Sequence, residues 1–352
     1  MEQEQSIGIK LIQWFQSNQR VLPWRRDYNP YHVWISEIML QQTRVDTVIA
    51  YFNAFIKAFP DLQRLANASE EEVLNMWKGL GYYSRARNIH QSAKILIQNF
   101  GGIFPENYED IRKLPGIGDY TAGAIMSIAF NKPIAAVDGN VLRVVSRVLT
   151  LSEDISKSKT KSMIGKEIET WIPPNSSRDF CQALMELGAL ICVPNLPKCS
   201  HCPISNSCKA LANLTQTAYP VKYRVEKNKP QYLYQAAIIL EDNKILLEYR
   251  HEVKLLGKMW GVPLILKSTE NTDRENFTDK YGLHLDIDLE CGLVKHIFTH
   301  QSWLLTVSRF HMKGNLPEST FLKWVLLDEL STLPIPTAFQ KVLSLGLSSY
   351  TN

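Results

Sequence analysis

The chain has 352 residues, of which 45% are hydrophobic and 21% charged, and its formal net charge at pH 7 is +4. This length suits two domains, each with enough apolar surface to bury a core. No apolar run approaches membrane-spanning length, and residues 1–15 contain two glutamates and no apolar signal core. We therefore expect a cytosolic protein and exclude membrane-embedded classes, while so modest a net charge neither requires nor excludes a polyanionic partner.

Helices are predicted one after another through the first 210 residues. Apolar residues recur at helical spacing from Val45 to Phe59, so one face of that segment is core. Ser69 and Glu72 have the spacing of a capping box and open a further helix. A longer helix is predicted from about Ser84 to Phe100, where a pair of glycines ends it.

Two short sequences between later helices suggest chemistry. A Leu-Pro-Gly-Ile-Gly sequence contains Gly116 and Gly118, which allow a tight hairpin whose N–H groups approach a phosphate at the next helix N-terminus. A plain turn between helices explains these five residues equally well. Further along, a Val-Asp-Gly-Asn sequence precedes an apolar helix, and its Asp138 or Asn140 suits the N-cap position.

Four of the six cysteines, Cys192, Cys199, Cys202 and Cys208, form the pattern C-x6-C-x2-C-x5-C. Thiolates this close in sequence converge on one centre, which is either a tetrahedral zinc or a [4Fe–4S] cluster. Zinc ligands usually come as two short pairs separated by a longer insert, whereas this segment has one short pair. The spacing therefore favours the cluster, and structural disulfides suit a reducing cytosol less well.

The character of the sequence changes after the cysteines. Residues 215–231 are polar and basic and contain two prolines, as expected of a linker. Apolar or β-branched runs at 233–240 and 245–249, joined by four polar residues, predict a β-hairpin, and 303–310 predicts another strand. We therefore expect an α+β domain at 232–352.

Together, the glycine hairpin, the Val-Asp-Gly-Asn sequence and the cysteine spacing resemble the iron–sulfur DNA glycosylases of the endonuclease III superfamily. Further matches resemble its MutY family of adenine DNA glycosylases. They are Trp24-Arg25, Pro30-Tyr31, Ser36-Glu37, Met39-Leu40-Gln41-Gln42-Thr43 and Gly79-Leu80-Gly81-Tyr82-Tyr83-Ser84-Arg85, with a Nudix-like C-terminal domain. The resemblance implies a multidomain protein. Its parts are an all-α catalytic region at 1–214 with a helix-hairpin-helix at about 114–123 and a cluster loop at 192–208, a linker at 215–231, and a Nudix-like α+β domain at 232–352.

This resemblance implies a monofunctional glycosylase that flips adenine out of DNA and excises it opposite 8-oxoguanine, and more weakly opposite guanine. Glu37 has apolar neighbours, so burial would favour the protonated form that a general acid needs. Asp138 would face the oxocarbenium-like sugar, as an electrostatic stabiliser or through a transient covalent link, with Asn140 beside it. Tyr120 stands where strand-cutting relatives have a lysine, and a phenol cannot form their Schiff base.

The resemblance also implies a set of residues that contact DNA or the excised base. Gln42 and Tyr82 match positions that wedge into the duplex, and Arg85 suits a nearby phosphate. The loop Phe298-Thr299-His300 matches a Phe-Ser-His loop that recognises 8-oxoguanine, with threonine in place of serine. The other members of the set are Arg20, Trp24, Arg25, Leu40, Thr43, Ser84, Gly116 and Gly118.

The expected cofactor is one [4Fe–4S] cluster, and the expected partner is double-stranded DNA with 8-oxoguanine:adenine or guanine:adenine mispairs. We expect a cytoplasmic, nucleoid-associated monomer without membrane contact. A thymine or oxidised-pyrimidine mismatch glycosylase of the same superfamily is the main alternative. A Nudix pyrophosphohydrolase is a second, but the metal-binding helix of that class keeps only Glu275 and Asp279 here, with Lys280 between the acids and the closing glycine. A DNA-binding adaptor without catalysis would have no use for Glu37 and Asp138 together.

Overall fold

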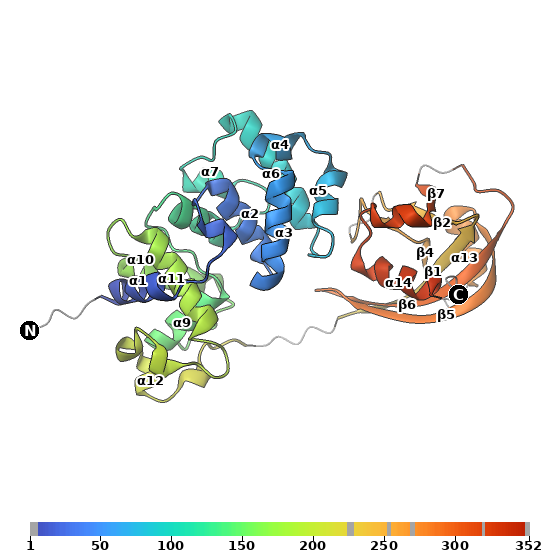
Figure 1. Ribbon diagram of the computed structural model, residues 1–352. Helices are drawn as coiled ribbons and strands as arrows, with labels where there is room; N and C mark the ends of the chain where they lie inside the picture. The colour runs from blue at the N-terminus through green and yellow to red at the C-terminus, as the bar shows by residue number, and fades with distance from the viewer. Residues whose placement is uncertain (1–5, 224–228, 252–254, 268–271, 319–320, 349–352) are drawn as a thin grey trace, which may run out of the picture. The chain divides into compact units, whose positions relative to one another are not determined.

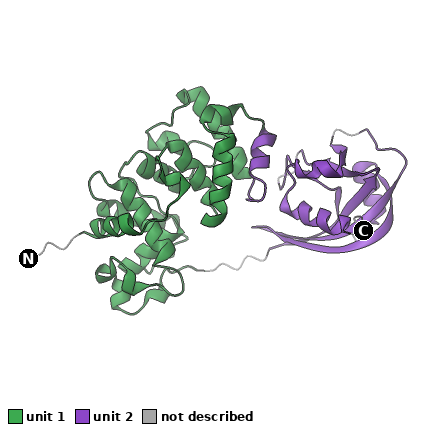
Figure 2. Ribbon diagram, in the orientation of Figure 1, with its two compact units in different colours: residues 1–69, 84–225 green, residues 70–83, 226–352 purple. Residues whose placement is uncertain are grey.

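The computed structural model describes residues 6–223, 229–251, 255–267, 272–318 and 321–348. The chain forms two compact units, residues 1–69 with 84–225, and residues 70–83 with 226–352 (Figure 2). The linker predicted at 215–231 includes residues 224–228, which lie outside the described residues. In the described part of the chain, no helix is long and apolar enough to cross a membrane.

The first unit is built from helices (Figure 1). Its helices are α1 Ile7–Asn18, α2 Pro30–Leu40, α3 Val45–Ala58, α4 Leu62–Asn67, α6 Ser84–Phe100, α7 Tyr108–Arg112, α8 Asp119–Ala124, α9 Gly139–Leu149, α10 Ser158–Trp171, α11 Ser177–Leu190 and α12 Lys209–Ala212. Short helical turns are η1 Pro23–Arg25, the π-helical η2 Ile125–Ala129, η3 Cys199–His201, η4 Ser205–Ser207 and η5 Gln216–Ala218. The helices predicted at 45–59 and 84–100, and the one after Asn140, are confirmed to within two residues.

One core of this unit lies among α1, α9, α10 and α11. Phe15, Val145, Ile164 and Phe180 are fully buried in it, and each contributes about 1.5–3 kcal/mol by leaving water. The same cluster reaches Ile204 and packs against Cys202, so the cysteine segment is an extension of the helical core. After that segment the backbone returns to the helices, where the Ile155 N–H donates to the Val221 carbonyl (3.1 Å).

The second unit contains a seven-stranded mixed sheet with the order β3-β2-β1-β6-β5, to which β4 adds on β1 and β7 on β2. Its elements are α5 Glu70–Met76, β1 Gln231–Glu241, β2 Lys244–Tyr249, β3 Trp260–Gly261, β4 Leu264–Leu266, α13 Asp273–Tyr281, β5 His284–Ile297, β6 Ser302–Lys313, β7 Leu322–Leu326, η6 Leu327–Ser331 and α14 Thr337–Leu347. Strands β1 and β6 run parallel, whereas the other pairs are antiparallel. The predicted hairpin is confirmed, with Asp242 and Asn243 both at positive φ in its turn.

The two faces of the sheet are covered by different helices because strand side chains alternate between faces. Ala236 and Ile238 of β1 pack in one cluster with Phe339 of α14. Ala237 and Ile239 pack in a second cluster with Phe277 of α13. The unit is therefore a sheet between two helices, which confirms the predicted combination of an all-α region and a C-terminal domain of mixed α and β structure.

Candidate active site and cysteine cavity

Glu37 lies in the middle of α2, a helix that is buried on nearly every side. Asn29 caps this helix and Pro30 opens it, and Trp34 and Met39 are completely buried beside the carboxyl group. Burial raises the pKa of Glu37 to about 7, and the nearby Asp138 charge raises it further against a lowering hydrogen bond from Tyr120. The predicted protonated carboxyl is thus supported by its surroundings.

Tyr120 and Glu37 are brought together by the hairpin that ends at Gly118. That glycine caps α8, and Tyr120 is the second residue of the helix, where its hydroxyl donates to Glu37 Oε2. Desolvation, with the negative charges of Glu37 and Asp138, holds the pKa of Tyr120 well above its usual range. The phenol therefore keeps its proton near neutral pH and donates a hydrogen bond to the carboxyl group.

Asp138 is both the helix cap and a member of the site. Its Oδ1 accepts from the Val141 N–H (2.7 Å) at the start of α9, and its Oδ2 accepts from Asn140 Nδ2 (2.8 Å). Burial raises the pKa of Asp138, while these hydrogen bonds and Arg143 favour its charged form. Asp138 can therefore act both as the N-cap of α9 and as a site residue, because the capping hydrogen bond fixes the orientation of its carboxylate.

Asn140 is held from its other side by Arg143 and by helix α11. Arg143 donates to Asn140 Oδ1, to the Gly188 carbonyl and to the Cys192 carbonyl, each at 2.8 Å. At Gly188 the two helices are so close that an added Cβ would lie 2.5 Å from Asn140 Cβ. Only glycine permits this approach of α11 to the N-terminus of α9.

Nine of the predicted residues line one cavity of about 900 Å³, which includes its opening to solvent. They are Arg20, Trp24, Arg25, Glu37, Leu40, Thr43, Tyr120, Asp138 and Asn140. The cavity also contains two residues of α11 that the sequence analysis missed, Gln182 and Glu186. They are polar residues four apart on an otherwise apolar, buried helix face, a pattern that marks them as unusual but does not identify their arginine partners.

Glu186 is 1% exposed and binds two of the predicted arginines. Arg20 donates to it through its backbone N–H (3.0 Å), Nε (2.8 Å) and a terminal nitrogen (2.8 Å), and Arg25 donates at 3.0 Å. Burial alone would raise the pKa of Glu186, but these hydrogen bonds lower it to about 2. The part of the cavity lined by Arg20, Arg25 and Glu186 therefore holds a fixed carboxylate bound by two guanidinium groups.

The other predicted residues lie outside this cavity. Gln42 and Tyr82 are exposed and have φ of 63° and 49°, an uncommon backbone conformation for non-glycine residues. Gly116 (φ 77°) requires glycine, because a Cβ would lie 2.7 Å from Asn88, and nothing surrounds the Cβ position of Gly118 within 4 Å. Ser84 is the first residue of α6.

Arg85 differs from the expectation of a phosphate contact. Its side chain is 8% exposed, and one terminal nitrogen donates to the carbonyls of Ile38 (2.7 Å), Met39 (3.0 Å) and Gln41 (2.7 Å). These carbonyls form the C-terminal end of α2, where backbone acceptors lack helical partners. Arg85 thus fastens the end of the helix that contains Glu37, rather than facing an approaching phosphate.

The predicted lesion loop lies between β5 and β6 of the second unit. The Phe298 N–H donates to the Gln301 carbonyl (2.8 Å), and its ring packs against His296 and Trp303 with centroids 4.5 and 4.8 Å away. Thr299 and His300 are exposed beyond this aromatic anchor. The loop therefore presents two polar side chains from a fixed base.

The acid-poor helix α13 uses its remaining polar groups internally. Glu275 completes a capping box with Thr272 at the start of α13. Lys280 Nζ donates to the Leu264 carbonyl and to the Tyr281 hydroxyl, both at 2.7 Å. A lysine ammonium thus stands where a Nudix hydrolase would need a further carboxylate.

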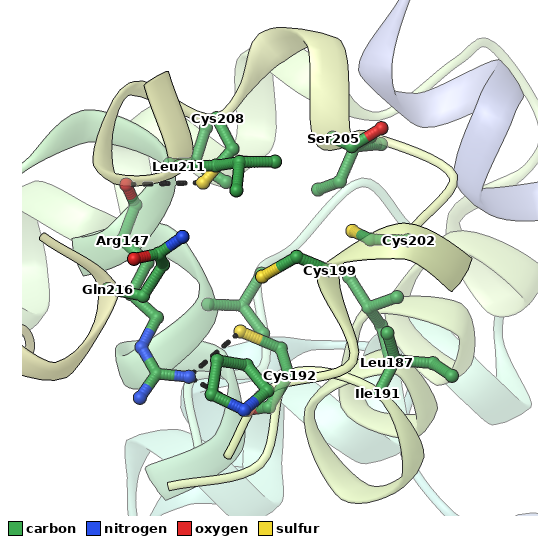
Figure 3. Close-up of a pocket in the computed structure, with 14 residues that line it drawn as sticks. Arg147, Leu187, Ile191, Cys192, Cys199, Cys202, Ser205, Cys208, Leu211 and Gln216 are labelled. Atoms are coloured by element: carbon green, nitrogen blue, oxygen red, sulfur yellow. Dashed lines mark hydrogen bonds between the residues drawn. The ribbon is translucent and has the colours of Figure 1, made fainter. Parts of the chain in front are cut away.

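All six cysteines are free thiols, and Cys192, Cys199, Cys202 and Cys208 line a single cavity of about 400 Å³ (Figure 3). Its other walls are largely apolar and include Leu187, Ile191 and Leu211. Within the described residues, no three or more His, Cys, Asp or Glu side chains are arranged to hold a single metal ion. Four thiols around one apolar cavity, whose volume includes its opening to solvent, are the donor set that an iron–sulfur cluster requires.

Comparison with known proteins extends these observations. The HhH-GPD superfamily of base excision DNA repair proteins matches residues 35–174, and the NUDIX domain matches residues 235–345. The adenine DNA glycosylase of Buchnera aphidicola subsp. Baizongia pistaciae is 41% identical over 74% of this chain and 74% of its own length. The human adenine DNA glycosylase is 32% identical over 94% of this chain and 72% of its own.

This chain belongs to the adenine DNA glycosylase family. Among solved structures, a thermostable thymine-DNA glycosylase is similar at a TM-score of 0.54 and 29% identity, covering 58% of this chain and 95% of that one. Endonuclease III in a non-covalent DNA complex has a TM-score of 0.51 at 23% identity, covering 61% of this chain and all of that one, which shows a shared fold. The family's helix-hairpin-helix region and Nudix-like domain are thus both present.

Proposed function

We propose that this chain is a monofunctional DNA glycosylase that excises adenine opposite 8-oxoguanine, and more weakly opposite guanine, in duplex DNA. The observation behind the proposal is a pair of carboxyl groups in one cavity, the buried Glu37 and the half-buried Asp138, which have different hydrogen-bond partners. Two observations support this substrate. Both reported relatives are adenine DNA glycosylases, and the chain has a NUDIX match at residues 235–345 in addition to its helical region.

In the proposed reaction the two carboxyl groups have different tasks. Glu37, protonated up to about pH 7, gives its proton to N7 of adenine, so the base leaves without a full negative charge. Asp138, charged and fixed by Val141 N–H and Asn140, stabilises the positive charge that develops on the sugar. Tyr120 orients Glu37 through its hydroxyl and supplies no amine, so no Schiff base forms there.

The wall formed by Arg20, Arg25, Gln182 and Glu186 is the proposed base pocket. It offers guanidinium and amide donors beside carboxylate and amide acceptors, the combination needed to read the edge of an extruded purine. The mutual pairing of Glu186 with the arginines fixes these groups before DNA arrives. Gln42, Tyr82 and the glycine hairpin are proposed to hold the duplex, and the protein to act as a monomer.

The four cysteines are the proposed ligands of a [4Fe–4S] cluster. The loop that contains these cysteines buries little apolar surface of its own. The main contribution of the cluster would therefore be to close and stiffen the loop by linking its thiolates. Purified protein is expected to be brown, with roughly four irons and four inorganic sulfides per chain. Stoichiometric zinc without sulfide would refute this assignment.

The proposed activity is tested by single-turnover excision on four labelled duplexes. Adenine opposite 8-oxoguanine should react fastest and adenine opposite guanine more slowly, with no reaction of adenine opposite thymine. Strand breaks should appear only after alkali, and borohydride should trap little protein on DNA, because Tyr120 cannot form an imine. Preferential release of thymine from a guanine:thymine duplex would instead support the mismatch-thymine alternative.

A further inference from the structure

Arg147, in the last turn of α9, is a buried cation with unusual partners. It is 2% exposed, and its guanidinium donates to the carbonyls of Tyr219 (3.1 Å), Val193 (2.7 Å) and Pro194 (2.6 Å). It also donates to Cys192 Sγ at 3.4 Å (Figure 3). In the described part of the chain, no aspartate or glutamate forms an ion pair with it.

Burying a charged side chain without a compensating negative charge destabilises the fold. Among the other buried arginines, Arg250 is paired with the carboxylate of Glu248, whereas Arg85 donates to backbone carbonyls at the end of α2. The carbonyl partners of Arg147 supply partial charges only. The remaining source of negative charge at this position is the set of cysteine thiolates, of which Cys192 is in direct contact.

We infer that Arg147 is the internal counter-ion of the cysteine-bound cluster, an inference that rests on the iron–sulfur cofactor proposed above. The guanidinium offsets the charge of the thiolates and donates an N–H to one ligand sulfur, and both effects stabilise the reduced cluster. Net charge and hydrogen bonds to sulfur are among the main determinants of iron–sulfur potentials. Arg147 is thus a positioning residue whose contacts are made with the ligands.

The same side chain connects the two ends of the cysteine loop. Its three carbonyl contacts join residues 192–194, where the cysteine segment begins, to Tyr219, which follows it. Its own carbonyl accepts from the thiol of Cys208 at 3.6 Å. One residue therefore contacts the first and the last cysteine of the pattern and joins both ends of the loop to α9.

Arg143, one helical turn earlier, is distinct from Arg147 in what it contacts. It donates to the Cys192 carbonyl and to Asn140, so its hydrogen bonds reach the active site and the backbone of Cys192, while the charges of both Cys192 and Asp138 act on it. The hydrogen bond to a ligand sulfur distinguishes Arg147, and substitutions there test it without direct loss of an Asn140 contact.

The test uses the full-length protein with Arg147→Lys, Arg147→Met and, as a matched control, Arg178→Met. Arg178 also donates to two backbone carbonyls of the helical unit, those of Ile128 and Ala129, but no contact to sulfur is recorded for it. Iron and sulfide content, the cluster's reduction potential and the rate of iron extraction by a chelator are measured for each protein.

Arg147→Met should lower the reduction potential and speed iron extraction roughly tenfold or more, the usual effect of losing a residue that supports metal ligands. Arg147→Lys keeps the charge and should retain the parental potential while releasing iron faster, which decides the case if the methionine variant fails to fold. An unchanged potential in Arg147→Met, or equal changes in Arg178→Met, overturns the inference. If the parent protein contains no iron or sulfide, the cofactor assignment itself is wrong. If the parent contains the cluster and the Arg147 variants are unaffected, only the proposed role of Arg147 is wrong.

Discussion

At the scale of single residues, the site depends on how differently two carboxyl groups are surrounded. Glu37 has apolar helix neighbours and one phenol donor, and its pKa rises to about 7. Asp138 has two donors on its two oxygens, which favour its charge. Two carboxyl groups in one cavity can therefore serve as acid and as anion at the same pH, which is the arrangement glycoside hydrolysis requires.

Replacing Glu37 with glutamine should slow adenine excision by roughly 10²- to 10⁴-fold, because an amide cannot supply the proton. Gel-shift affinity for the same duplex should be retained, and its loss would mark the residue as structural instead. In the parent, single-turnover rates should fall as the pH rises through about 7, where Glu37 loses its proton. A flat profile between pH 6 and 9 would contradict the assignment.

Although Glu37→Gln should slow excision, it should raise the stability of the fold at alkaline pH. The folded-state pKa of Glu37 lies above its unfolded value, so its contribution is present below the unfolded pKa and is lost as the pH rises through about 7. Because glutamine does not ionise, Glu37→Gln removes this pH-dependent loss of unfolding free energy, which amounts to about 1.4 kcal/mol for each unit by which the pKa is raised. Urea unfolding should therefore show the variant gaining stability over the parent at pH 8 compared with pH 5.

Local sequence was sufficient to predict Glu37 but not Glu186. The neighbours of Glu37 are apolar on both sides, so its burial follows from any helical arrangement. Glu186 becomes interpretable only when Arg20, 166 positions earlier, is placed beside it. Arg85 could not be interpreted from its neighbours in sequence either. Nothing near it in the chain indicates that its guanidinium donates to the carbonyls at the end of another helix.

At the scale of elements, the site is assembled by the close approach of α11 to the start of α9. The helical periodicity of both segments is visible in the sequence, and so is the cap at Asp138. The distance between the two helices cannot be predicted from the sequence, because it depends on which residue of one helix faces which residue of the other. Gly188 is the position where that distance is set.

Gly188→Ala should therefore reduce excision, by roughly tenfold to a hundredfold if Asn140 is displaced by a fraction of an ångström to 1 Å. The matched control is Gly165→Ala in α10, where the nearest atom to a new Cβ is 3.7 Å away. This control should gain about 0.5–1 kcal/mol of stability, as alanine usually does in a helix, with normal excision. Equal rates in the two variants would show that the helix contact does not govern the carboxylate.

At the scale of the whole molecule, chemistry and proposed lesion recognition lie in different units. The cavity with Glu37 belongs to the helical unit, and the loop Phe298-Thr299-His300 belongs to the sheet unit. In the second unit, the sequence predicted β1, β2 and β6 from their apolar or β-branched runs. The sheet order was not, because the parallel pairing of β1 with β6 joins strands about sixty residues apart in sequence.

His300→Ala should lower the ratio of excision rates opposite 8-oxoguanine and guanine by roughly fivefold, the value of one polar contact of about 1 kcal/mol. Thr299→Ser should leave this ratio nearly unchanged, because the hydroxyl is retained and only side-chain stiffness changes. The measurement is single-turnover excision on both mispairs. An unchanged ratio in His300→Ala would assign discrimination to the helical unit.

The contacts beyond Cys208 also fix where the helical unit can be separated from the rest of the chain. The Tyr219 carbonyl accepts from Arg147, and the Val221 carbonyl accepts from the Ile155 N–H, so both residues belong to the helical fold although they lie within the predicted linker. A fragment that stops at Leu214 would lose both anchors, whereas one that stops at Tyr223 would keep them. Any comparison of the isolated catalytic unit with the intact protein is therefore valid only when the shorter chain extends past Val221.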